Sequence, residues 1–303
     1  IVLGTALVDM YAKCGMLAKA AHVLEGLPAR DTVSWNALIA GYTHEGQGHE
    51  ALNCFSLMRR EGLSPNEVTF TCILSACSCI ATIDKGTQIH NEIVNAGLLA
   101  TNIALGNALV DMYAKCGLLS HAWQLLEELP VRDRISWNAI ITAYAEDGRC
   151  DEAFNCYSQM VREGITPNEV TFACILKACG CTGAIDKGKQ IHHEIVNRGL
   201  LKNNMLGTAL VDMYAKCGNL KKAHEVLREL PERNVVSWNA LISGYSQNEQ
   251  GHEALNCFEC MQREGISPNI ITLTCVLKAC GSIGAIDKGK QVHDEIINNE
   301  LLE

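Results

Sequence analysis

The 303-residue sequence contains no long apolar run and no excess of positive charge. A membrane-spanning helix needs a run of about 18 apolar residues, and none is present, which predicts that the chain does not cross a membrane. Its 25 Lys and Arg residues are outnumbered by 34 Asp and Glu residues, so the formal net charge is −9. This acidic balance by itself argues against a nucleic-acid partner, because phosphate binding relies on Lys and Arg.

The sequence also shows no targeting segment, no low-complexity segment and no sustained strand-like alternation of apolar and polar residues. It begins at Ile1 instead of a methionine, as expected for a mature segment or a fragment. The 16 cysteines recur singly in fixed contexts, for example at Cys14, Cys116 and Cys217. We therefore expect small buried apolar thiols and not a disulfide framework, which favours a reducing compartment.

What the sequence does contain is one large unit that occurs three times. The string YAKCG begins at Tyr11, Tyr113 and Tyr214, so its copies are separated by 102 and then 101 residues, and the strings SWNA and Pro-Asn recur at the same spacings. Each large unit divides into a short, a standard and a long repeat, with no residue left over. The nine predicted repeats of this single array are 1–31, 32–66, 67–102, 103–133, 134–168, 169–203, 204–234, 235–269 and 270–303.

Each small repeat has the pattern of a helical hairpin. In the repeat 32–66, Trp35 and Leu38 lie on one apolar stripe at helical spacing, Gly46 interrupts it, and a second stripe runs towards Pro65. A single hairpin cannot bury both of its faces, whereas stacked hairpins can. The sequence therefore predicts an all-α fold, an α-solenoid of nine helix-turn-helix repeats with a concave inner surface.

Two helical repeat families share features with this pattern. The tetratricopeptide pattern W-x2-L-G-x2-Y fits Trp35, Leu38 and Tyr42, but Ile39 stands where its glycine is expected, and a uniform array would not alternate in repeat length. The strings ALVDMYAKCG, SWNALISGY, EALNCF, MQREGISPN and IDKGKQIH, together with the alternating lengths, resemble the PLS subclass of the pentatricopeptide repeat family over the whole chain. Repeats 1–31 and 204–234 are identical at 21 of 31 positions, which favours a consensus-designed array.

This resemblance implies a right-handed α-solenoid that binds single-stranded RNA with one base per repeat. It also implies a chloroplast or mitochondrial location and a role as an RNA-editing specificity factor without a catalytic domain, hence no enzymatic activity and no cofactor. A small protein partner, a multiple organellar RNA editing factor, is expected to bind through the long repeats. A tetratricopeptide-like scaffold that binds proteins remains the alternative.

The resemblance assigns base choice to the fifth and the last residue of each repeat. An Asp carboxylate only accepts hydrogen bonds, which suits uracil and guanine, and an Asn amide can also donate, which suits cytosine and adenine. In the family, Asn at the fifth position favours pyrimidines and Thr favours purines, so the predicted target is 5′-G-C-N-U-C-N-A-C-N-3′. The predicted base-reading residues are Thr5 with Asp31, Asn36 with Asn66, Asn107 with Asp133, Asn138 with Asn168, Thr208 with Asn234, and Asn239 with Asn269.

Other interpretations of these positions stay open. Asp31, Asp133 and Asn234 could be loop or cap residues only. The second residue of a repeat is expected, by resemblance, to pack against the flat face of a base, although buried packing would explain the same aliphatic residues. These second residues are Val33, Val68, Ala104, Ile135, Val170, Met205, Val236 and Ile271.

The long repeats lack clear reading pairs. They carry Thr71 with Asn102, Ala173 with Asn203, and Thr274 without a clear last residue, so we expect them to add little base choice. Two further motifs are incomplete. The segment GAIDKGK at 183–189 lacks the Ser or Thr of a phosphate-binding loop. The H-x-E that starts at His192 lacks the P-C-x-x-C of zinc deaminases.

Overall fold

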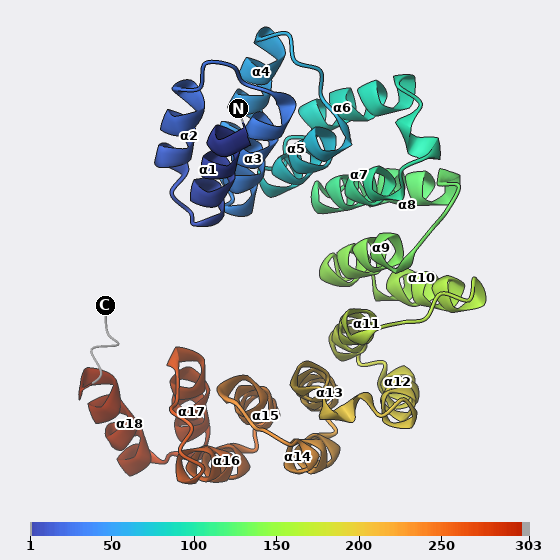
Figure 1. Cartoon of the computed structure of the whole chain (residues 1–303). Helices are drawn as coiled ribbons and strands as arrows, with labels where there is room; N and C mark the ends of the chain where they lie inside the picture. Colours follow the sequence, from blue (N-terminus) through green and yellow to red (C-terminus); the bar gives the residue numbers. More distant parts are fainter. Residues whose placement is uncertain (1, 299–303) are drawn as a thin grey trace. The chain divides into compact units, whose positions relative to one another are not determined.

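The computed structural model describes residues 2–298, and this part of the chain contains only helices and their connections. The predicted all-α class is confirmed (Figure 1). The chain divides into two compact units, Ile1–Ala143 and Tyr144–Glu303, and the boundary falls inside α9 (Arg134–Glu146). No helix in the described range is long and apolar enough to cross a membrane.

The helices alternate between the first and the second member of a hairpin. In the first unit they are α1 (Val2–Lys13), α2 (Leu17–Glu25), α3 (Thr32–His44), α4 (Gly48–Arg60), α5 (Glu67–Cys79), α6 (Ile83–Asn95), α7 (Ile103–Lys115) and α8 (Leu119–Glu128). After α9, the second unit contains α10 (Cys150–Arg162), α11 (Glu169–Thr182), α12 (Ile185–Asn197), α13 (Asn204–Lys216), α14 (Leu220–Glu229), α15 (Val235–Gln247), α16 (Gly251–Arg263), α17 (Ile270–Ile283) and α18 (Ile286–Asn298). Two short 3-10 helices, η1 (Leu98–Ala100) and η2 (Leu200–Lys202), follow α6 and α12.

Two layers of helices build each unit. First helices pack side by side, α1 on α3, α5 and α7 in turn in one unit, and α11 on α13, α15 and α17 in the other. A second helix packs on its own first helix and on the first helix of the next hairpin, as α4 does on α3 and α5 and as α14 does on α13 and α15. Side chains between the layers, such as Ile39, Phe55 and Ile73, are fully buried, which is how stacking hides the apolar faces that one hairpin would expose.

Side-chain caps start the first helices. Asn66 precedes α5 in an extended conformation, and its side chain accepts the N–H of Thr69 while the Thr69 hydroxyl accepts the N–H of Asn66. This reciprocal capping box satisfies backbone donors that no helical bond can reach. The same arrangement at Asp31, Asn234 and Asn269 starts α3, α15 and α17.

The two incomplete motifs have structural positions. Gly183 ends α11 in the left-handed region (φ 68°), and the remainder of GAIDKGK enters α12, so the segment is a turn between two helices. His192 is buried on α12, and its Nδ1 lies 2.9 Å from the hydroxyl of Tyr214 on α13. The first motif is therefore a turn within one hairpin, and the second belongs to the packing between hairpins.

The cysteines are all free, as predicted, and most are buried or half-buried. Burial raises the pKa of the Cys54 thiol to about 11 and that of Cys156 to about 12. The expectation of burial is wrong at Cys14, which is exposed, and only partly right at Cys116 and Cys217, which are half-buried. Cys116 and Cys217 lie at the C-caps of α7 and α13, where the chain turns towards solvent.

Candidate nucleic-acid interface

In two standard repeats the predicted reading residues touch each other. Asn36 Nδ2 on α3 donates to Asn66 Oδ1 at 3.0 Å, and Asn239 Nδ2 on α15 donates to Asn269 Oδ1 at 2.9 Å. Both fifth residues are 7% exposed, so their amides lie at the edge of the buried layer. The fold thus brings together two side chains that stand 30 residues apart in the sequence.

The short repeats are less uniform. Asn107 Nδ2 donates to Asp133 Oδ1 at 3.1 Å and lies 3.2 Å from Oδ2, so this pair also meets. Thr5 Oγ1 is buried and has no hydrogen-bond partner among the described residues, so the Thr5 hydroxyl does not reach Asp31.

In the middle standard repeat, Asn168 caps α11 by accepting the N–H of Thr171 at 3.1 Å.

The last residue of each reading pair is also the N-cap of the next first helix, and this fixes which atom it presents. Asn66 Oδ1 accepts both the Thr69 N–H at 3.0 Å and the Asn36 amide. Because a backbone N–H only donates, the capping atom must be the oxygen, and the Asn66 amide nitrogen points away from the cap. Asn66 is therefore an N-cap and also a partner of Asn36, and its amide nitrogen remains available as a hydrogen-bond donor.

Asp133 uses the same cap but leaves an acceptor. Its Oδ1 accepts the N–H of Ile135 at 2.8 Å and that of Ser136 at 3.0 Å. Its Oδ2 lies 3.2 Å from the Asn107 amide nitrogen and takes no part in the cap bonds to Ile135 and Ser136. At Asp31 the N–H of Ser34 lowers the pKa of the carboxyl against the opposing effect of burial, so this group is an ionised acceptor at neutral pH. Asn and Asp thus present opposite polarity from one backbone position.

A buried hydroxyl that the sequence analysis missed supports the standard pairs. Thr69 is fully buried, and its Oγ1 donates to Asn36 Oδ1 at 2.7 Å, while Thr272 Oγ1 donates to Asn239 Oδ1 at 2.6 Å. The amide of the fifth residue is therefore held at both ends. The N-x-x-T spacing predicts a cap, but nothing local in the sequence predicts a bond to the preceding hairpin.

The corresponding serine of a short repeat does not give this support. Ser136 Oγ donates to the Asp133 backbone carbonyl at 2.9 Å. Asn107 Oδ1 remains buried and without a hydrogen-bond partner within residues 2–298. The Asn107 amide is therefore held at one end only.

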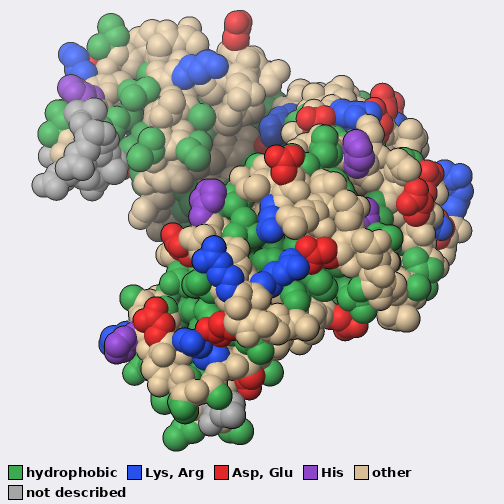
Figure 2. Space-filling view, turned by 90° about the horizontal axis from the view of Figure 1, so that it is seen from above, with side chains coloured by type: hydrophobic (Ala, Val, Ile, Leu, Met, Phe, Trp, Pro, Cys, Tyr) green, Lys and Arg blue, Asp and Glu red, His purple; other side chains and the backbone are tan. Residues whose placement is uncertain are grey.

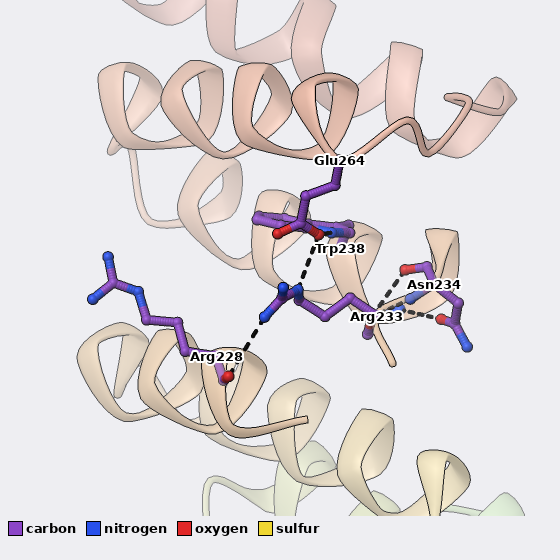
Figure 3. Close-up of polar contacts among 6 residues, drawn as sticks. Arg228, Arg233, Asn234, Trp238 and Glu264 are labelled. Atoms are coloured by element: carbon purple, nitrogen blue, oxygen red, sulfur yellow. Dashed lines mark hydrogen bonds and ion pairs between the residues drawn. The ribbon is translucent and has the colours of Figure 1, made fainter. Parts of the chain in front are cut away.

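A charged cluster secures the loop of the short repeats. Figure 3 shows Arg233, which precedes Asn234, between Arg228 and Glu264. Arg233 Nε lies 2.9 Å from Glu264 Oε2, which also accepts the Trp238 Nε1–H at 3.2 Å. In the first large unit Arg30 pairs with Glu61 at 2.8 Å, and Trp35 Nε1 donates to the same carboxylate at 2.9 Å. The loop before each of these two caps is thus tied to the next repeat.

The second residues are exposed, so the alternative that they form buried packing is wrong. Their exposed fractions run from 45% at Val170 to 65% at Ile135, and Ala104 is also exposed. Val2, which the sequence analysis omitted, occupies the same position of the first repeat and is 86% exposed. The repeat spacing alone would have found it.

The surface carries mixed charge. On the face in Figure 2, acidic and basic side chains are interspersed and do not form a broad basic patch. Ion pairs such as Arg59–Glu92 at 2.9 Å and Lys216–Asp212 at 2.7 Å occupy several of the cations. Affinity that depended on phosphate contacts alone would therefore be weak.

Comparison with known proteins identifies the repeat. The model of the PPR repeat family matches residues 30–79, 132–181 and 233–282, and the PPR repeat model matches 107–133 and 208–235. The matches together cover more than half of the chain. The chain belongs to the pentatricopeptide repeat family.

Similar plant proteins are longer than this chain. A mitochondrial pentatricopeptide repeat-containing protein of Arabidopsis thaliana is 41% identical over 296 residues, which is 98% of this chain and 29% of the relative. A chloroplastic pentatricopeptide repeat-containing protein of the same plant is 37% identical over 283 residues, 93% of this chain and 46% of the relative. The chain therefore spans less than half the length of these pentatricopeptide repeat relatives.

Solved structures confirm the solenoid fold class. The crystal structure of the pentatricopeptide repeat protein PPR10 in complex with an 18-nt psaJ RNA element aligns with a TM-score of 0.78 at 20% identity, over 95% of this chain and 44% of PPR10. PPR10 from maize, in a further crystal structure, aligns with a TM-score of 0.74 at 20% identity, over 98% of this chain and 44% of that chain.

Proposed function

We propose that this pentatricopeptide repeat chain binds single-stranded RNA, and that each short or standard repeat selects one base. The observation that carries the proposal is the polarity of the last residue. The cap consumes one oxygen of Asn66 or Asp133, and what remains is an amide donor in one case and a carboxylate acceptor in the other. The crystallised complex of PPR10 with RNA, a protein of the same fold, supports RNA as the ligand.

The presented atoms match the pairing edges of the bases. The Asn66 amide can donate to the ring nitrogen of cytosine, and the Asp133 carboxylate can accept the ring N–H of uracil. The fifth residue adds the preference for pyrimidine or purine that the family resemblance implies. Taken in chain order, the pairs specify 5′-G-C-N-U-C-N-A-C-N-3′, with the N-terminal repeat at the 5′ end.

Exposed aliphatic side chains support base stacking. Val33 is 61% and Val236 is 57% exposed, one residue into the helices that carry Asn36 and Asn239. Packing a base on such a side chain removes apolar surface from water without regard to base identity. This contact supplies affinity that does not depend on a basic surface.

The long repeats are assigned a different role. The Thr71 hydroxyl donates to the Glu67 carbonyl at 2.9 Å, and the Thr274 hydroxyl donates to the Ile270 carbonyl at 2.7 Å, so both fifth residues bond within their own helix. The last residue of the ninth repeat lies outside the described residues. We expect a multiple organellar RNA editing factor to use the long repeats, and we expect an editing-specificity role in a chloroplast or mitochondrion, where several relatives are placed by name.

Asn269→Asp tests the base assignment directly. The new carboxylate keeps the cap but replaces the presented donor with an acceptor, so the base at position 8 of the target should change from C to U. A mismatched buried hydrogen bond costs about 1–3 kcal/mol, which is roughly tenfold to a hundredfold in affinity. Binding of four RNAs that differ only at position 8 measures the change.

Asn91→Asp is the matched control, because it adds the same charge at an exposed position of α6. It should weaken all four RNAs equally and slightly. If Asn269→Asp behaved in the same way as this control, the assigned reading positions would be wrong. Binding of unrelated proteins but of no RNA would instead favour the scaffold function.

A further inference from the structure

The start of the second helix of a standard repeat packs closely on the end of the next first helix, and in two of the three large units a glycine permits this. A Cβ at Gly48 on α4 would lie 2.8 Å from the carbonyl oxygen of Ala76 on α5, and a Cβ at Gly251 on α16 would lie 2.9 Å from that of Ala279 on α17. The middle large unit has Cys150 at this position, and this residue is 3% exposed. A buried thiol therefore stands where the other two units have no side chain.

A second difference in the middle unit leaves space for the Cys150 side chain. A Cβ at Gly48 or Gly251 would also lie 2.7 Å from the Cγ2 of an isoleucine, Ile80 or Ile283. The middle unit has the shorter Thr182 at this position, and the Thr182 hydroxyl donates to the Ala178 carbonyl at 2.9 Å. Glycine and isoleucine are thus replaced together, by cysteine and threonine.

The residue before Thr182 brings a second thiol to the same place. In the third large unit, a Cβ at Gly251 would lie 2.9 Å from the hydroxyl oxygen of Ser282. Cys181 occupies the position of Ser282, so the fold places the side chains of Cys150 and Cys181 next to each other. Within a disulfide the Cβ of one cysteine lies about 3 Å from the sulfur of the other. The spacing of these two positions therefore suits a covalent bond.

The two thiols differ in how they meet solvent. Cys181 is exposed and can react with a dissolved reagent, whereas Cys150 is buried. Burial, followed by the neighbouring Cys181, raises the pKa of the Cys150 thiol, so Cys150 is not the group that reacts first. Cys179 on the same helix as Cys181 is fully buried, and burial raises the pKa of its thiol to about 12, so Cys179 is a poor competitor.

We propose that Cys150 and Cys181, which are free thiols in the structure, form a reversible disulfide in the presence of a low-molecular-weight disulfide such as oxidised glutathione. The Cys181 thiol loses its proton and attacks one glutathione sulfur, which forms a mixed disulfide and releases one glutathione as a thiol. Cys150 then attacks the Cys181 sulfur, and its proton passes to the second glutathione thiolate as that group leaves. Two protein thiols are oxidised to one disulfide, and one glutathione disulfide is reduced to two thiols.

The bond would join the standard repeat 134–168 to the long repeat 169–203. Cys181 lies in the last turn of α11, whereas the Asn168 cap stands at the other end of this helix, so the reading residue keeps its place. A cross-link between two helices restricts the unfolded chain and thereby stabilises the folded one. Oxidation therefore raises the melting temperature and leaves base choice unchanged.

Peptide mass spectrometry tests the pair, and the first large unit contains an internal control. The chain is treated with oxidised glutathione, its remaining thiols are alkylated, and it is digested without reduction. We expect the peptides that contain Cys150 and Cys181 to be joined by a link that dithiothreitol breaks. Cys79 is exposed as Cys181 is, but the counterpart of Cys150 there is Gly48, so Cys79 should retain its glutathione.

Two variants separate the disulfide from general oxidation. Cys150→Ser removes the second thiol, so Cys181 should retain glutathione as Cys79 does, and oxidation should no longer raise the melting temperature. Cys79→Ser removes an exposed thiol elsewhere and should keep both the link and the rise. Glutathione retained on Cys181 of the unmodified chain, or a link from Cys181 to any other cysteine, would overturn the proposal. Equal melting temperatures of the oxidised and reduced unmodified chain would overturn the stabilising role.

Discussion

Standard and short repeats use the same pair of positions but support them differently. In the standard repeats, Asn239 is bonded at one end to Asn269 and at the other to the buried Thr272 hydroxyl. In the short repeat, Asn107 has the bond to Asp133 but a buried carbonyl oxygen without a partner among the described residues. In the standard repeat a threonine hydroxyl bridges the fifth residue and the cap. In the short repeat the serine at the same position turns back and bonds to the cap alone.

The difference follows from both residue type and length. The fifth and last residues are 30 positions apart in the standard repeat and 26 apart in the short repeat. The segment that joins them is therefore shorter in the short repeat, and it brings the cap residue to the fifth residue by a different route. The short repeats brace this path with an ion pair, Arg233 to Glu264, instead of the buried hydroxyl. Hydrogen bonds in a buried site resist salt, whereas half-exposed ion pairs do not. We therefore expect the standard repeats to discriminate bases more strictly.

Removing the bridging hydroxyl should give the largest effect. Thr272→Val leaves the Asn239 oxygen buried without a donor and also breaks the capping box, so we expect a loss of about 2–3 kcal/mol in unfolding free energy. The choice of C at position 8 should weaken because the amide can rotate. Urea denaturation followed by circular dichroism, and binding of the four position-8 RNAs, measure the two effects.

Ser237→Ala is the matched control at Asn234, the cap residue that ends a short repeat. It breaks the cap at Asn234 in the same way but removes no bond to the fifth residue, so it should cost only about 1 kcal/mol and leave base choice at position 7 intact. Thr272→Ser keeps a hydroxyl, but a serine can turn back to the cap as Ser136 does, so it should restore the choice at position 8 only in part. Equal loss of base choice in Thr272→Val and Ser237→Ala would show that the cap, and not the bridge, sets discrimination.

A second comparison changes the fifth residue itself. Asn36→Thr removes an amide that makes two hydrogen bonds, whereas Asn107→Thr removes one bonded atom and one unpartnered oxygen. The standard-repeat variant should therefore be less stable than the short-repeat variant by about 1 kcal/mol. Thermal unfolding of the two variants in one buffer provides the measurement, and equal melting temperatures would contradict the difference in support.

The ion pair of the short repeats should give the smallest effect. Arg233 and Glu264 side chains are 32% and 33% exposed, so Arg233→Gln should cost about 0.2–1 kcal/mol at low salt and less at 1 M salt. Lys216→Gln, which breaks a pair at 2.7 Å on the surface of α13, is the control away from the reading loop. Arg233→Gln should lower base choice at position 7 at low salt, and Lys216→Gln should not. This result would show that the Arg233–Glu264 ion pair supports base recognition.

Much of this protein followed from the sequence. The apolar stripes at helical spacing determined the hairpins, because each stripe must be buried and only stacking buries it. Asp and Asn before the first helices of the hairpins, from α3 onward, determined their caps, since these side chains satisfy backbone donors that no helical bond can reach. Residue type alone could not predict whether Val33 and its counterparts are exposed or buried, because an aliphatic side chain fits either environment.

The tertiary structure alone decided which atom each reading residue presents. The sequence identifies Asn66 and Asp133 as residues that can bond a base, but an amide has two orientations. The neighbouring helix end fixes one of them, because the Thr69 N–H can only donate and so requires the oxygen of Asn66. The hydrogen bond from Thr69 to Asn36 joins residues 33 positions apart, and the Asn107 oxygen is buried without a hydrogen-bond partner among the described residues. Both features depend on how distant residues pack, which spacing along one chain does not encode.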